Sequence, residues 1–136
     1  MGDLSEHFSR HELACPHCGV CELDARLVPA LEQLRAAAGV PIVVHDAYRC
    51  EAHNKAVGGV AHSQHPMGMA ADVGIEGKTL KEMYELATSV PDFAGGGIGL
   101  YDGGFVHVDV RKGAARWARV NGKYVGIGEL LKDGGK

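Results

Sequence analysis

Apolar side chains recur at helical spacing in two segments of the chain. The first, residues 24–38, has a leucine every three or four positions, opens on an aspartate suited to the N-cap and is followed by Gly39 as a stop signal. The second starts at Thr79, where Glu82 three residues later completes a capping box, and it ends before Pro91. Both segments are predicted to be amphipathic helices.

Short apolar or alternating runs predict the strands, and most of them follow the helices. Asp102-Gly103-Gly104 and Asn121-Gly122 are hairpin signals between neighbouring runs. The predicted strands are residues 41–45, 69–75, 95–101, 105–111, 117–120 and 123–127. A further helix is expected over residues 51–57. Strands grouped in this way indicate an α+β fold, with a small antiparallel sheet and helices packed on it.

Length and composition favour one soluble domain. With 136 residues and a hydrophobic fraction of 46%, we expect a single domain over 1–136 with a Cys-rich N-terminal segment at about 8–23. A net charge of −3 argues against non-specific electrostatic binding to nucleic acid. Neither a membrane span nor a signal peptide is visible in the sequence, so we expect a cytoplasmic protein or one released to the cell wall by phage-type lysis. We also expect a monomer.

Candidate chemistry begins with an acid inside an apolar run. Asp72 sits among alanine and valine in the strand predicted over 69–75, where a buried charge needs a cation or strong donors. His65 precedes it by seven positions, and Gly68 between them lets the chain turn back. In the strand predicted over 105–111, valines alternate with polar residues, which puts His107 and Asp109 on one face.

His65, Asp72 and His107 together have the composition of a catalytic zinc site. Three such ligands leave one tetrahedral position for a water, whose proton a nearby carboxylate must accept during amide hydrolysis. Asp109, about 7 Å along the strand from His107, is the first candidate for this base, and Asp102 in the hairpin turn is the second. Asp72 could instead be a hydrogen-bonded structural carboxylate. Asp109 could instead orient a ligand histidine.

The cysteines leave a second question open. Cys15, Cys18 and Cys21 follow one another at intervals of three, and Cys50 stands apart. The first three could bind a second, structural zinc ion, with Cys50, His11 or His17 as the fourth ligand. Free thiols and a single disulfide are the alternatives.

These residues occur in an order that resembles a known family. The matching segments are Tyr48-Arg49, His53-Asn54, Gly58-Gly59, Ser63-x-His65, Gly68, Ala70, Asp72 and Phe105-Val106-His107-Val108-Asp109. They resemble the zinc D-alanyl-D-alanine carboxypeptidases, whose superfamily shares its fold with the hedgehog signalling domain. The resemblance spans roughly residues 8 to 117 and is strongest to the short branch found among phage endolysins and small bacterial peptidases.

The resemblance implies a zinc peptidase that cleaves bonds next to D-amino acids in peptidoglycan peptides. It places zinc on His65, Asp72 and His107. It makes Arg49 the residue that stabilises the oxyanion or clamps a substrate carboxylate, with Ser63 and Tyr48 binding substrate. Many relatives carry an acid three residues before the last histidine, where this chain has Gly104. A non-catalytic zinc-binding module of the same fold is therefore the alternative.

Overall fold

The structure is a computed structural model that describes residues 5, 7–8, 13–14, 23–47 and 69–131. Within these ranges it contains helices and strands in the following order: α2 (Leu27–Ala38), β1 (Ile42–Asp46), β2 (Ala70–Ile75), α4 (Leu80–Thr88), α5 (Pro91–Ala94), β3 (Gly97–Tyr101), β4 (Phe105–Asp109), β5 (Ala115–Val120), β6 (Lys123–Val125) and α6 (Gly128–Leu131). The helix predicted over 51–57 lies outside the described residues.

The ends of the two long helices follow from local hydrogen bonding. At the start of α4, Thr79 Oγ1 accepts from the Glu82 N–H at 3.1 Å, and Glu82 Oε1 accepts from the Thr79 N–H at 2.9 Å, so the predicted capping box is confirmed. Gly39 ends α2 in the left-handed conformation, with φ of 68°. The N-cap prediction for Asp24 is wrong, because α2 begins at Leu27 and the Asp24 carboxylate instead pairs with Arg26.

Six strands form one mixed sheet in the order β1-β2-β4-β3-β5-β6. Each neighbouring pair is antiparallel except β3 and β5, which are parallel. The expected antiparallel sheet is therefore mixed, because this one pairing is parallel. The reason is positional: β4 already has β2 on one side and β3 on the other, so the chain after β4 passes the start of β3 and pairs with its free edge. The α+β class is confirmed.

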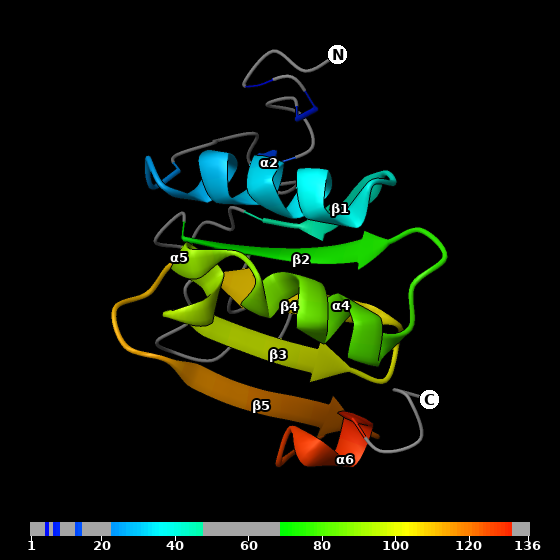
Figure 1. Ribbon diagram of the computed structural model, residues 1–136. Coiled ribbons are helices and arrows are strands. Elements are labelled where there is room, and N and C mark those ends of the chain that lie inside the picture. The colour runs from blue at the N-terminus through cyan, green and yellow to red at the C-terminus, as the bar shows by residue number, and fades with distance from the viewer. Residues whose placement is uncertain (1–4, 6, 9–12, 15–22, 48–68, 132–136) are drawn as a thin grey trace.

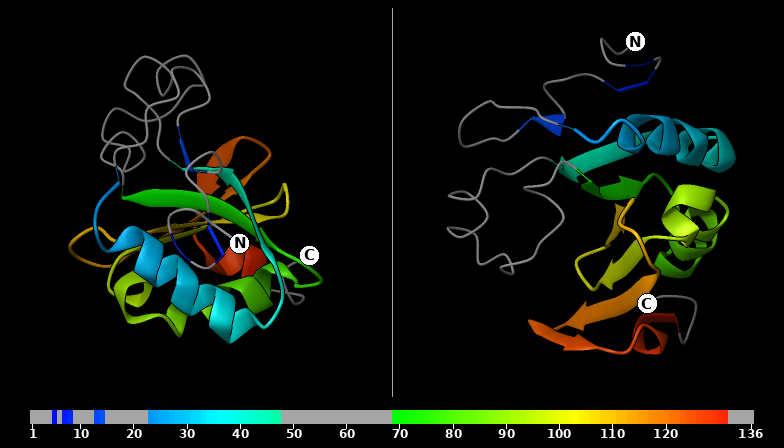
Figure 2. Two further views of the ribbon diagram at one scale, coloured as in Figure 1. Left: turned by 90° about the horizontal axis from the view of Figure 1, so that it is seen from above. Right: turned by 90° about the vertical axis from the view of Figure 1, so that its left-hand side faces the viewer.

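The described helices α2, α4 and α5 lie on one face of the sheet (Figure 1 and Figure 2). On the covered face, the alternating positions of β2, β3 and β4 are buried and apolar, as the period of two requires. These positions are Ala71, Val73, Ile75, Ile98, Leu100, Val106 and Val108. The opposite face of the same strands carries Asp72, His107 and Asp109.

Two short helices extend the predicted pattern. Pro91 was expected only to stop the preceding helix, but it also begins α5, a single turn in which proline occupies the first position and costs no hydrogen bond. The Arg116 guanidinium of β5 then donates to the carbonyls of Ala94 and Gly96 at 2.7 and 2.8 Å, which ties the end of α5 to the sheet. The second, α6, follows β6. No helix in the described part of the chain is long and apolar enough to cross a membrane.

Gly96 gives a direct test of this packing. A Cβ at this position would lie 2.2 Å from the Asp109 carbonyl oxygen, and backbone cannot move aside cheaply. We expect Gly96→Ala to lower the free energy of unfolding by about 1–3 kcal/mol, measured by chemical denaturation. Gly95→Ala is the matched control, since its Cβ would lie an ordinary 3.5 Å from the Pro91 carbonyl oxygen. Equal stability of the two variants would contradict the close approach.

Candidate metal centre

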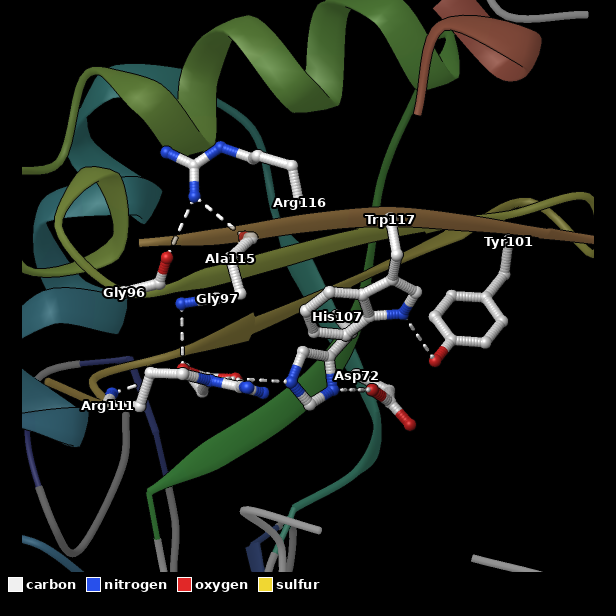
Figure 3. A network of polar contacts seen from close by, with 10 residues as sticks. Asp72, Gly96, Gly97, Tyr101, His107, Arg111, Ala115, Arg116 and Trp117 are labelled. Carbon is white, nitrogen blue, oxygen red and sulfur yellow. Dashed lines mark hydrogen bonds and ion pairs between the residues drawn. The ribbon is translucent and has the colours of Figure 1, made fainter. Parts of the chain in front are cut away.

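Asp72 and His107 face each other across two antiparallel strands. Asp72 of β2 is the register partner of His107 of β4, and His107 is in turn opposite Gly99 of β3, which is opposite Trp117 of β5. The pairing therefore places an acid, an imidazole, a glycine and an indole in one row, on the sheet face opposite the described helices. Figure 3 shows the resulting cluster of side chains.

The His107 ring lies between two carboxylates. Its Nδ1 is 3.0 Å from Asp72 Oδ1, and its Nε2 is 2.7 Å from Asp109 Oδ2. Only 5% of His107 is exposed. Both ring nitrogens are thus directed at named oxygen atoms, and the predicted sharing of one face by His107 and Asp109 is confirmed.

Asp109 is fully buried, at 0% exposure, and is surrounded by donors. Oδ1 accepts from the Gly97 N–H at 2.8 Å, and from the Arg111 backbone N–H at 3.1 Å. Arg111 Nε lies 2.9 and 3.0 Å from the two oxygens, and Arg111 Nη2 donates to Oδ2 at 2.7 Å. A carboxylate with this many charge-assisted and backbone donors is ionised in the folded protein.

The pKa values of the two partners move in opposite directions. Burial alone would raise the pKa of Asp109, but hydrogen bonds from His107 and Arg111 outweigh it and hold that pKa well below its usual range. Burial alone would lower the pKa of His107, but its bonds to Asp109 and Asp72 outweigh burial and raise that pKa. In each case a partner of opposite charge favours the charged form: the two carboxylates do so for His107, and His107 together with Arg111 does so for Asp109.

An aromatic wall borders the pair. The Trp117 ring lies 5.0 Å from the His107 ring, centroid to centroid, and its Nε1–H donates to the Tyr101 hydroxyl at 3.2 Å. Gly99 makes room for this indole, because a Cβ there would lie 2.4 Å from ring atoms of Trp117. The Arg111 guanidinium lies over the same indole, 5.2 Å from its centroid. Trp117 therefore packs against both His107 and the cation that neutralises Asp109.

Asp102, the second candidate base, is in the turn between β3 and β4. It is exposed, and its Oδ2 accepts from the Asn121 N–H at 2.9 Å. The turn begins beyond the Tyr101–Phe105 pair, two residues along β4 from His107. Asp102 thus joins one hairpin turn to the next.

Several predicted site residues lie outside the described residues. They are His65, Arg49, Ser63, Tyr48, Cys15, Cys18, Cys21 and Cys50. Among the residues that the structure does describe, no three His, Cys, Asp or Glu side chains form a group able to hold a metal ion. Zinc binding by His65, Asp72 and His107 together stays a prediction, as does a second zinc at the cysteines.

The donor chemistry of the described pair nevertheless fits a cation. An ionised Asp109 can only accept, so the short contact places the His107 proton on Nε2 and leaves the Nδ1 lone pair facing Asp72 Oδ1. Two acceptors 3.0 Å apart are stabilised when a cation is shared between them, either a proton or a metal ion. Neutral imidazole and carboxylate are both ordinary zinc ligands.

Sequence reasoning did not find the residues that surround His107. Trp117, Tyr101, Gly97 and Gly99 are brought there through strand pairing, which the hydrophobic pattern does not specify. One signal was present in the sequence: the run Gly95-Gly96-Gly97 precedes a buried strand, where glycine often marks a close approach by another group.

Comparison with known proteins places the chain in a family context. Residues 6–109 match the family described as Peptidase M15, so the match covers well over half of the chain and includes Asp72, His107 and Asp109. No curated protein gives a match.

Burial of Tyr101 should make the free energy of unfolding depend on pH. Burial raises the pKa of Tyr101 from 10.0 to about 12, so the folded state holds this proton more tightly than the unfolded chain does. The resulting stability is fully present below pH 10 and is lost as the pH rises towards about 12. We expect the unfolding free energy, measured by denaturant titration, to fall less steeply over this range in Tyr101→Phe. Parallel curves for the two proteins would contradict the burial of this hydroxyl.

Proposed function

This chain belongs to the Peptidase M15 family, and from that premise we propose that it is a zinc-dependent hydrolase of peptide bonds next to D-amino acids in peptidoglycan. The family match supports a zinc peptidase of the D-Ala-D-Ala carboxypeptidase type. The observation that carries the proposal is the 3.0 Å approach of His107 Nδ1 to Asp72 Oδ1 on facing strands, within the matched residues. The substrate would be a stem peptide or a cross-link.

The described residues supply two of the three predicted zinc ligands. A zinc ion held by His107 and Asp72, with His65 as the third ligand, would polarise the scissile carbonyl and activate a water molecule for attack. The described side chains around His107 would orient and shield these ligands. Asp109 holds the far side of the His107 ring, and Trp117 covers one of its faces.

Substrate recognition is assigned by the family resemblance. Arg49 would bind a substrate carboxylate or the oxyanion, and Ser63 and Tyr48 would contact the peptide. The pocket shape around these groups, more than the metal chemistry, determines whether a terminal residue or a cross-link is cut. We therefore propose the reaction class, carboxypeptidase or endopeptidase, and leave the choice between them to the experiment below.

The first test is metal content. We expect purified protein to bind zinc, measured by elemental analysis after dialysis, and His107→Ala to lose it because one of three ligands is gone. His7→Ala is the control, since His7 Nδ1 pairs with Glu32 on α2 at 2.7 Å, in the helical layer. Zinc content unchanged in a His65→Ala His107→Ala double variant would contradict the proposed ligands.

The second test is cleavage of purified peptidoglycan. We expect new amine termini and, by mass spectrometry of the released peptides, either loss of terminal D-alanine or conversion of cross-linked dimers to monomers. Activity should be absent in His107→Ala. After zinc is removed with a chelator, added zinc should restore activity to the wild type but not to His107→Ala. Zinc binding without new amine termini would instead favour the non-catalytic module. This alternative is motivated by Gly104, which occupies the position where an acid is expected and has a φ of 95°.

A further inference from the structure

We propose that Asp109, paired with Arg111, is a positioning residue that holds His107 so that Nδ1 is the metal-binding atom, and that Asp109 is not the general base. The proposal rests on the zinc site proposed above at His107 and Asp72, and it does not depend on which peptide is cleaved. It replaces the first sequence-based candidate for the base with a different role for the same side chain.

The first argument is that both Asp109 oxygens are already engaged. Oδ1 accepts from Gly97 N–H and from Arg111, and Oδ2 accepts from Arg111 and from His107. A general base needs an oxygen within hydrogen-bond reach of the attacking water. With 0% exposure and donors on both oxygens, Asp109 has its carboxylate committed to protein groups.

The second argument concerns which nitrogen of His107 carries the proton. The Arg111 guanidinium keeps Asp109 ionised and therefore acceptor-only, so the 2.7 Å contact fixes the hydrogen on Nε2. The Nδ1 lone pair is then directed at Asp72 Oδ1, 3.0 Å away. A carboxylate that accepts from the far N–H of a ligand histidine is the usual way in which proteins fix the tautomer and ring orientation of that ligand.

The third argument is that the surroundings hold Asp109 in this position. A Cβ on Gly97 would lie 2.3 Å from Asp109 Oδ2 and 2.8 Å from Arg111 Nε, so glycine is needed for the carboxylate to sit here. Arg111 is itself held over the Trp117 ring. The Asp109 carboxylate is thus fixed by β4, by the neighbouring strand β3 and by the Arg111 guanidinium over Trp117. A fixed carboxylate is better suited to orienting a ligand histidine than to exchanging protons with a water molecule.

Zinc affinity of Asp109→Asn is the central test. We expect zinc to bind about 10–100-fold more weakly than in the wild type, measured by competition with a chromogenic chelator, because the amide no longer fixes the Nε2 hydrogen. Asp24→Asn is the matched control. Asp24 binds Arg26 two residues on through the same three kinds of contact, from the backbone N–H, Nε and Nη2 at 2.9, 3.0 and 3.1 Å, but it precedes α2 and is not part of the sheet that carries His107. Its zinc affinity should stay at the wild-type value.

Kinetics at saturating zinc separate positioning from base catalysis. If Asp109 positions His107, Asp109→Asn regains a kcat within about tenfold of the wild type once zinc is in excess. If Asp109 is the base, zinc affinity stays unchanged and kcat falls by about 100-fold or more at every zinc concentration, which would overturn the proposal. Lack of peptidase activity in the wild type would count against the proposed function alone, because zinc affinity is measured without substrate.

A spectroscopic measurement needs no variant. In zinc-loaded wild-type protein, long-range proton–nitrogen correlation spectra should show the His107 hydrogen on Nε2 and a metal-bound Nδ1; a hydrogen on Nδ1 would overturn the proposal.

If Asp109→Asn does not fold, Arg111→Lys serves in its place, because it keeps the charge but loses the planar two-nitrogen contact. We expect weaker zinc binding there too, with unfolding of the zinc-free protein measured in parallel to separate the loss of zinc from a loss of stability.

Discussion

Burial of the Asp109 carboxylate is the interaction on which the rest of the described site depends. An ionised group at 0% exposure is tolerable only when donors and an opposite charge replace the water it has lost. Arg111 supplies the charge, Gly97 supplies a backbone N–H without a Cβ in the way, and His107 supplies the last donor. The position of the imidazole is therefore a consequence of how a neighbouring acid is buried.

The two faces of the sheet explain why this arrangement is on one side. The valines of β4 point into the apolar layer under the helices, so the intervening positions must share the opposite face. Register then decides which side chains meet: Asp72 comes opposite His107, and Gly99 leaves room for Trp117 next to it. A shift of one residue in β2 would move Asp72 into the helical layer and break the pair.

Local patterns in the sequence predicted the parts of this structure that depend on neighbouring residues. Helical spacing, the Thr79 capping box and the strand alternation around His107 were all predictable from sequence, whereas zinc binding by His65, Asp72 and His107 stays a prediction. Pairing between distant strands was not predictable: nothing in a period of two reveals that β5 runs parallel to β3 or that Gly97 donates to Asp109. The failed N-cap prediction at Asp24 has a local origin instead, because its carboxylate accepts from Arg26 two residues on.

Charge balance connects the buried pair to the metal site. Among Asp72, His107, Asp109 and Arg111, the cation of Arg111 neutralises the acid it contacts, so with a neutral imidazole the remaining negative charge sits on Asp72. That is also where the Nδ1 lone pair of His107 points. The pKa of His107 is raised by its bonds to both Asp109 and Asp72, and a divalent ion bound between Nδ1 and Asp72 would compete with a proton there, as ligand deprotonation requires. Arg111 thus confines the attraction for a cation to the His107–Asp72 side of the ring.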